Sequence, residues 1–175
     1  MSSLAGKTVI VTGASKGIGA ATAHAVIKAG ARLIAHYGND RAGAEKATSF
    51  ARDGQVTLLK SDFSNMDAVD AFWSQALKAA DGYIDVLVNN AGIMHQIGGI
   101  EDPIEDWEEA WSHSIAVNVK APARLLRHAV RSWLQAEKTG SIISIGSWVT
   151  TRGTSNPGAI AYAASKAAIA AATKT

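Results

Sequence analysis

Residues 12–19 read Thr12-Gly-Ala-Ser-Lys-Gly-Ile-Gly19, and they join a short β-branched run to an alanine-rich stretch with helical character. Gly13 can take backbone angles that other residues resist. Gly17 lets the backbone approach a phosphate closely, and Gly19 lets the helix pack tightly against the strand. The amino end of the helix then offers free N–H groups and the positive end of its dipole. A strand, a glycine-rich turn and a helix in this order indicate a dinucleotide-binding unit.

On the carboxyl side of this turn, β-branched runs alternate with longer helical stretches along the rest of the chain. Strands are expected at residues 8–12, 32–36, 55–59, 84–88 and 141–145, and helices at 18–29, 40–52, 66–80, 102–135 and from 159 onward. This alternation predicts right-handed βαβ units. We therefore expect an α/β fold, a Rossmann-like doubly wound parallel sheet, in a single domain of residues 1–175.

The long helix carries recognisable start and bend signals. Asp102 is expected to be its N-cap, with Pro103 as the first helical residue and Glu105 completing a capping box. Pro122 is expected to bend the helix because proline cannot donate the internal hydrogen bond. The polar, Gly- and Pro-containing residues 150–158 are expected to form a loop beside the functional site.

The composition is that of a globular domain, with 47% hydrophobic residues and a net formal charge of +2. Nothing in this charge favours nucleic acid or an acidic membrane surface as a partner. The chain has no cysteine, which excludes disulfides and thiolate metal sites and suits a reducing, cytoplasmic location. Its five histidines lack metal-ligand spacing, so no metal site is expected. Neither a signal peptide nor a membrane-spanning run is predicted.

The glycine spacing, T-G-x-x-x-G-x-G, resembles the fingerprint of the short-chain dehydrogenase/reductase family, and the resemblance continues along the chain. Residues 89–92 match the family's NNAG motif, and Tyr162-Ala-Ala-Ser-Lys166 matches its YxxxK signature. Asp62, Asn118 and Ser147 fall where the family has an adenine-contacting aspartate, a helix asparagine and a catalytic serine. The chain is similar to 3-oxoacyl-acyl-carrier-protein reductase-like members. The resemblance implies the strand order 3-2-1-4-5 and a nicotinamide cofactor.

The predicted catalytic residues are Asn118, Ser147, Tyr162 and Lys166. Tyr162 and Lys166 are four residues apart, so they share one face of a helix. A lysine ammonium stabilises the tyrosine anion, which allows the phenol to exchange a proton with a carbinol oxygen. Ser147 can donate a hydrogen bond to the same oxygen. By resemblance, Asn118 holds a water that connects the lysine to solvent. The expected activity is the interconversion of a carbonyl and a secondary alcohol by hydride transfer.

The expected cofactor is NADP(H) rather than NAD(H). An NAD enzyme of this kind has an acid at the end of its second strand, where Tyr37 stands here, and Asp40 lies too far along. Lys16 and Arg41 could bind a 2′-phosphate. The predicted cofactor-binding residues are Gly13, Ser15, Lys16, Gly17, Ile18, Gly19, Tyr37, Arg41, Asp62, Phe63, Asn90, Ala91, Gly92, Tyr162 and Lys166.

Two alternatives remain open. Residues 165–175 are strong helix sequence without a C-cap, so we expect an N-terminal portion of a longer protein with an open sheet edge. A dinucleotide-binding module without turnover is then an alternative function, because the family's substrate-binding region follows the YxxxK helix. The other alternative is a different glycine-rich α/β enzyme, such as a methyltransferase, in which the YxxxK motif would have no role.

The resemblance leaves the substrate open. Family members act on acyl-carrier-protein thioesters, sugars, steroids and small ketones, and fold analogy does not choose among them. Met94, His95, Gln96 and Trp148 are expected to line the substrate site. Family members usually assemble by packing the long helices of their subunits against one another. The resemblance therefore implies a homodimer or homotetramer.

Overall fold

The computed structural model describes residues 3–175 and contains a five-stranded parallel sheet in the order β3-β2-β1-β4-β5. The strands are β1 (Thr8–Val11), β2 (Arg32–Tyr37), β3 (Val56–Lys60), β4 (Val86–Asn89) and β5 (Ser141–Ser144). The predicted parallel α/β fold and strand order are therefore confirmed. Strand β1 is central: Val9 lies opposite Leu33 of β2 on one side and Val86 of β4 on the other.

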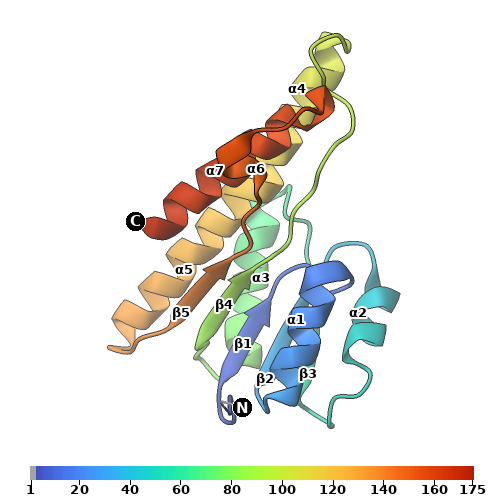
Figure 1. Ribbon diagram of the computed structural model, residues 1–175. Helices are drawn as coiled ribbons and strands as arrows, with labels where there is room; N and C mark the ends of the chain where they lie inside the picture. Colours follow the sequence, from blue (N-terminus) through green and yellow to red (C-terminus); the bar gives the residue numbers. More distant parts are fainter. Residues whose placement is uncertain (1–2) are drawn as a thin grey trace.

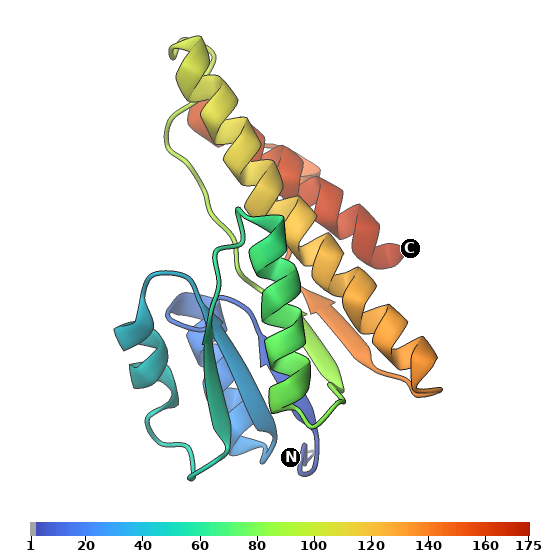
Figure 2. The same cartoon turned by 180° about the vertical axis from the view of Figure 1, so that it is seen from behind.

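Helices cover both faces of the sheet (Figures 1 and 2). They are α1 (Gly17–Lys28), α2 (Arg41–Thr48), α3 (Met66–Ala79), α4 (Ile104–Ile115), α5 (Ala121–Gln135), α6 (Val149–Arg152) and α7 (Ile160–Lys174). Helices α1 and α2 lie on one face, and α3 and α5 lie on the other. A π-helical turn, Ala116–Lys120, joins α4 to α5 into one long helix, and α7 packs alongside it. No helix of residues 3–175 is long and apolar enough to span a membrane.

The alternation of side chains along β1 divides the core into two layers. Val9 and Val11 are buried against α1, where Val26 and Ile27 pack. Ile10 points to the opposite layer, which holds residues of α3 and α5 such as Phe72 and Leu125. Because the central strands β1, β2 and β4 are buried on both faces, they read as largely apolar runs rather than as polar–apolar alternation, whereas the edge strands β3 and β5 are only partly covered.

The predicted capping box of the long helix is wrong. The Asp102 carboxylate accepts a hydrogen bond from the Gly99 N–H at 2.7 Å, so it closes the preceding loop instead. Helix α4 begins at Ile104, after Pro103, with no side-chain cap. Gly98, at φ +85°, lets the chain turn back so that the Asp102 side chain faces the loop rather than the helix.

Two further boundaries differ from expectation. Helix α2 ends at Thr48, before the predicted residue 52, because the Gln55 side chain binds the following turn. Its amide accepts from the Arg52 N–H at 3.2 Å and donates to the carbonyl of Ala31 at 3.0 Å. The stretch predicted as loop, 150–158, contains most of the short helix α6 and the first two residues of a 3-10 turn at residues 157–159.

The predicted bend near Pro122 takes the form of a local widening of the helix. Proline has no N–H, so the α-helical hydrogen bond that would tie residue 122 to the previous turn cannot form. The chain instead passes through the π-helical turn just before it. The Pro122 carbonyl accepts a hydrogen bond from the Asn89 side chain at 3.2 Å, which ties this point of the helix to the end of β4. Such π turns are frequent at functional sites.

Candidate active site

The glycine turn after β1 has the geometry that its three glycines allow. Gly13 has φ +68°, and a Cβ there would lie 2.9 Å from the Ala91 Cα. A Cβ on Gly19 would lie 2.0 Å from the Gly13 carbonyl oxygen, so any side chain would collide with backbone. Gly17 has φ +56°, and no atom lies within 4 Å of where its Cβ would be. The turn is closed at its base and open in front of Gly17.

The NNAG segment braces this turn from the end of β4. The Asn90 side chain donates to the carbonyl oxygens of Thr12 at 2.8 Å and Gly13 at 3.1 Å. The Thr12 hydroxyl accepts the backbone N–H groups of Asn90 and Ala91, each at 2.9 Å. The Asn90 amide thus holds the two neighbouring strand ends together, and the expected contact of Asn90 with a cofactor stays a prediction.

The amino end of α1 fits an anionic ligand. The helix begins at Gly17, its N-cap Lys16 makes no side-chain cap hydrogen bond, and its first turn contains no acid. Lys16 and Ile18 are exposed, whereas the Ser15 hydroxyl donates to the Asp40 carbonyl at 2.7 Å. The first N–H groups of a helix have no internal partner, and the dipole adds positive potential there. A dinucleotide pyrophosphate matches this combination of free donors, open space and an adjacent cation.

Just after the end of β2, the Asp40 carboxylate is already engaged in capping a helix. Asp40 caps α2 by accepting from the Gly43 N–H at 2.8 Å. Tyr37 is buried, with 6% of its surface exposed, so its ring belongs to the core. Arg41 is exposed and pairs with Glu45 at 2.7 Å. The pKa of the Arg41 guanidinium is raised, first by its hydrogen bond to Glu45 and then by the neighbouring Tyr37.

The end of β3 presents Asp62 and Phe63 next to the same turn. Asp62 is exposed, and its carboxylate accepts hydrogen bonds from the Ser64 N–H at 2.9 Å and the Ser64 hydroxyl at 2.8 Å. These hydrogen bonds lower the pKa of Asp62. Phe63 is 5% exposed, and its ring stacks on His36 at a centroid distance of 3.9 Å. The Phe63 ring therefore packs in the core, and the expected contact of Phe63 with a cofactor stays a prediction.

Asn118 lies in the π-helical turn and is 2% exposed. Its side-chain amide donates to the Ile93 carbonyl at 2.9 Å and to the Ser165 hydroxyl at 3.0 Å, and its oxygen accepts from the Ile93 N–H at 2.8 Å. The residue thus ties the segment after NNAG to α7. The wide π turn is what directs this side chain inward between the two elements.

Lys166 enters the same cluster from α7. Its ammonium donates to the Ile145 carbonyl at 2.8 Å, and burial lowers the pKa of Lys166 below its ordinary value. A Cβ on Gly92 would lie 3.2 Å from the Asn118 Oδ1 and 3.5 Å from the Lys166 Nζ, so the three residues converge. The same Nζ lies 5.9 Å from the centroid of the Tyr162 ring.

Ser147 lies between β5 and α6 and is partly exposed, as is Tyr162. The Ser147 hydroxyl lies 3.5 Å from the Val149 backbone nitrogen, and the Ser147 carbonyl accepts a hydrogen bond from the Thr150 hydroxyl at 2.9 Å. The following Trp148 is 69% exposed. Strands β4 and β5 are adjacent and parallel, so Ser147 and the NNAG segment follow the same edge of the sheet.

The segment after NNAG is anchored to two other elements. His95 lies 3.0 Å from His113 of α4 through ring nitrogens, and Gln96 accepts from the Asn156 side chain at 3.3 Å. Met94 is 51% exposed. The predicted substrate-lining residues 94–96 therefore form a bridge between α4 and the segment before α7. Among residues 3–175, no group of three or more potential ligands could hold a metal ion.

One residue that the sequence did not point to is His36, at the end of β2. It is 3% exposed, and its Nδ1 accepts the Gly13 N–H at 3.1 Å. Its position immediately before Tyr37 is a signal of closeness to the site, whereas the spacing of the histidines along the chain bears only on metal binding. The contact depends on the path of the glycine turn, which composition and spacing do not reveal.

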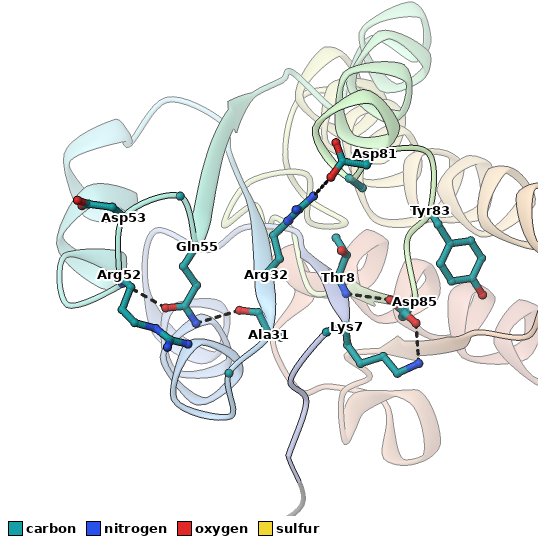
Figure 3. A pocket seen from close by; sticks show the side chains of 14 residues that line it. Lys7, Thr8, Ala31, Arg32, Arg52, Asp53, Gln55, Asp81, Tyr83 and Asp85 are labelled. Carbon is teal, nitrogen blue, oxygen red and sulfur yellow. Dashed lines mark hydrogen bonds and ion pairs between the residues drawn. The ribbon is translucent and has the colours of Figure 1, made fainter.

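A separate pocket of about 580 Å³ lies at the other end of the strands, away from the glycine turn (Figure 3). Two ion pairs cross its lining: Lys7 bonds Asp85 at 2.8 Å, and Arg32 bonds Asp81 at 2.6 Å. Asp85 also accepts the Thr8 N–H at 2.8 Å. Ligands of open parallel sheets bind at the carboxyl ends of the strands, whereas this pocket lies at their amino ends. We therefore infer that these contacts stabilise the amino ends of the strands and do not form a ligand site.

Comparison with known proteins agrees with this geometry. The family model for short chain dehydrogenases matches residues 7–175. The chain belongs to the short-chain dehydrogenase/reductase family. A family relative from Colletotrichum higginsianum is 37% identical over 175 residues, covering 98% of this chain and 63% of the relative. The chain thus spans less than two thirds of the length of that relative.

Solved structures of family members superpose well on the chain. A metagenomic short-chain oxidoreductase in complex with NADP has a TM-score of 0.78 and 35% identity, covering 96% of this chain and 72% of its own. A 3-ketoacyl-(acyl-carrier-protein) reductase from Brucella melitensis, complexed with NADH, has a TM-score of 0.83 and 29% identity, covering 98% and 68%. Family members of this fold therefore include structures with either nicotinamide dinucleotide.

Proposed function

We propose that the protein is an NADP(H)-dependent oxidoreductase that interconverts a carbonyl and a secondary alcohol, with Tyr162 as the general acid and base. The observation that supports this most directly is the convergence of Gly92, Asn118 and Lys166, one turn of helix from Tyr162. The dinucleotide would lie along the glycine turn with its pyrophosphate at the amino end of α1. When bound, the nicotinamide donates or accepts the hydride.

In the direction of reduction, the Tyr162 hydroxyl donates its proton to the substrate oxygen as the carbonyl becomes an alcohol. The Ser147 hydroxyl donates a hydrogen bond to the same oxygen and orients it. The ammonium of Lys166 stabilises the phenolate left behind. Burial lowers the pKa of Lys166, which makes its proton easier to pass on. Asn118 holds the backbone of Ile93 and the hydroxyl of Ser165 around this group.

The preference for NADP(H) is supported by charge at the adenosine end. Lys16 and Arg41 are exposed cations beside the turn, and the Asp40 carboxylate is engaged in capping α2. A 2′-phosphate would meet these two cations, and the Arg41–Glu45 pair is exposed enough to rearrange. The substrate is a small molecule with a carbonyl or secondary alcohol group.

We also propose that the protein forms a homodimer or homotetramer through its long helices. Val130 and Leu134 of α5 are 37% and 72% exposed, although large apolar side chains on a helix favour burial. They lie on the helix that continues directly from α4.

The test is turnover of a panel of ketones by the purified protein with NADPH, followed by the ultraviolet absorbance of the cofactor. Tyr162→Phe should lower kcat about 10²- to 10⁴-fold, the usual contribution of general acid–base catalysis. Tyr83→Phe is the matched control, because the Tyr83 hydroxyl donates to the Thr139 carbonyl, away from the site. Unchanged turnover in Tyr162→Phe would exclude the mechanism. NADPH binding without any turnover would instead favour a dinucleotide-binding module.

A further inference from the structure

The ring of His36 has two hydrogen-bond partners of opposite kind. Its Nδ1 lies 3.1 Å from the Gly13 backbone nitrogen, and its Nε2 lies 3.0 Å from the Ser61 carbonyl oxygen. An amide N–H can only donate and a carbonyl can only accept. Both contacts are therefore satisfied only by the neutral ring that carries its hydrogen on Nε2. A protonated ring would present an N–H to the Gly13 N–H and break that bond.

The surroundings of His36 favour this neutral form. Its ring stacks on Phe63 with an interplanar angle of 6° and meets the edge of Phe72 at a centroid distance of 5.2 Å. Burial lowers the pKa of His36 to about 4, and the Ser61 carbonyl opposes that shift only in part. No charged side chain of residues 3–175 contributes to the shift, and the nearby Asp62 carboxylate bonds Ser64 instead.

His36 also controls two consecutive amides of the glycine turn. Its ring accepts the Gly13 N–H, and its own backbone carbonyl accepts the Ala14 N–H at 2.9 Å. These bonds turn the first two amides of the loop toward β2. The amides at the start of α1 are thereby left as the donors that face open space in front of Gly17.

The same ring connects the turn to the end of β3. Ser61, which accepts from Nε2, immediately precedes Asp62, and its own N–H donates to the Tyr37 carbonyl at 3.1 Å. The three segments that surround the adenosine half of the proposed site therefore meet at one buried imidazole. They are the glycine turn, the end of β2 and the end of β3.

We propose that His36 is a positioning residue of the dinucleotide site, whose neutral ring fixes the glycine turn and couples it to the loop after β3. This rests on the proposed dinucleotide binding. The ring does not touch the ligand in this role; it sets the direction of the amides that do. Loss of the ring acceptor should therefore weaken dinucleotide binding while leaving the chemical step at saturation unchanged.

Two substitutions separate the hydrogen bonds from the packing. His36→Phe keeps an aromatic ring beside Phe63 but removes both hydrogen bonds. It should raise the Kd for NADPH about tenfold, the cost of one unsatisfied buried donor, and leave kcat at saturating NADPH within about twofold. His36→Asn places an oxygen near the position of Nδ1, so it should retain the bond to Gly13 and bind NADPH nearly as wild type. His24→Phe is the matched control, because the exposed His24 of α1 packs against Phe50 with its ring tilted by 37°.

A second measurement uses the free protein and does not depend on turnover. Hydrogen exchange of the Gly13 amide, followed by NMR, should be faster in His36→Phe and close to wild type in His36→Asn. The nitrogen chemical shifts of His36 should report the neutral form protonated at Nε2 at neutral pH. In the folded protein the ring of His36 becomes protonated only as pH falls through about 4, the lowered pKa of His36. Wild type should therefore lose NADPH affinity more steeply than His36→Asn as pH falls from about 5 to below 4. Both proteins meet the same titrating ligand phosphate, so the difference between their profiles reports the ring.

Equal NADPH affinity in wild type and folded His36→Phe would overturn the proposal. So would a Gly13 amide that exchanges at the wild-type rate in His36→Phe. If His36→Phe does not fold, His36→Asn decides: matching NADPH pH profiles in wild type and this variant would contradict the role. If the protein binds no dinucleotide at all, the proposed function fails, whereas the Gly13 exchange rates still test what His36 does to the turn.

Discussion

At the scale of single residues, cofactor preference should depend on the two exposed cations beside the glycine turn. Lys16→Ala and Arg41→Ala should each raise the Kd for NADPH about five- to tenfold, the cost of a lost charge-assisted contact, and change the Kd for NADH less than twofold. Titration calorimetry with both dinucleotides measures this difference. An equal loss for both ligands would show that these cations do not read the 2′-phosphate.

Glu45 supplies a matched variant for the same experiment. It holds Arg41 through an exposed ion pair at 2.7 Å, and solvent screens such a pair so that it contributes little to stability. Glu45→Gln frees the guanidinium and removes a negative charge from the region. NADPH should then bind slightly more tightly, by about twofold, with no change for NADH. Weaker NADPH binding in this variant would mean that the ion pair, rather than the free cation, forms the phosphate site.

The residues of the candidate site could be predicted to different extents. The glycine turn was recognisable because Gly13, Gly17 and Gly19 occupy positions that backbone geometry restricts to glycine, and such restrictions are local. His36 was not recognisable, because its role arises where β2 passes the turn. The bracing role of the Asn90 amide was hidden for the same reason: its acceptors, on Thr12 and Gly13, lie at the end of another strand.

At the scale of elements, the strands were predictable because each one is a short, largely apolar run between turn residues, and most of these runs are rich in β-branched residues. Helix ends were less so, since a cap depends on the path of the loop before it. Asp102 has the right residue type and spacing for an N-cap, but Gly98 and Gly99 bring a competing N–H to its carboxylate. Helix α6 is too short to have a period of its own, and only the tertiary packing against α7 reveals it.

The packing of α3 against α5 should carry a measurable pH dependence through Asp70. Arg124 and His128 both donate to its carboxylate, with the His128 Nε2 at 2.7 Å, and the hydrogen bond from Arg124 is the main reason that the pKa of Asp70 falls to about 2. A carboxyl with a depressed pKa stabilises the fold above its unfolded pKa of about 3.9, and that stabilisation is lost as pH falls toward 2.

Asp70→Asn should therefore destabilise the protein at neutral pH. The Asp70 side chain is 36% exposed and solvent screens the interaction, so we expect about 1 kcal/mol, or about 2–4 °C in Tm. Calorimetry between pH 7 and 3 should show the difference from wild type shrinking as pH falls below about 5. Asp53→Asn is the control, because Asp53 lies away from the long helix, is exposed and has no ion pair among residues 3–175. A difference that stays constant with pH would exclude the carboxylate as its source.

At the scale of the whole molecule, the long helix is electrically divided. Its first part, α4, carries four acids, namely Glu105, Asp106, Glu108 and Glu109, whereas α5 carries arginines and no acid. Arg127 and Arg131 of α5 are exposed and have no ion pair among residues 3–175. A twofold axis across this helix would set two copies antiparallel, so that the acidic part of one faces the basic part of the other.

This arrangement gives the proposed assembly a test by charge reversal. Replacing both Arg127 and Arg131 with Glu should shift the oligomer toward monomers, as measured by sedimentation or light scattering, because like charges would then face each other. Replacing Glu108 and Glu109 with Arg in the same chain should restore assembly, while each pair alone weakens it. Apolar contact through Val130 and Leu134 is unaffected by these changes, so added salt should reduce the effect of the reversal. If the fourfold variant stays monomeric as the arginine-reversed variant does, the two helices do not meet in the antiparallel sense.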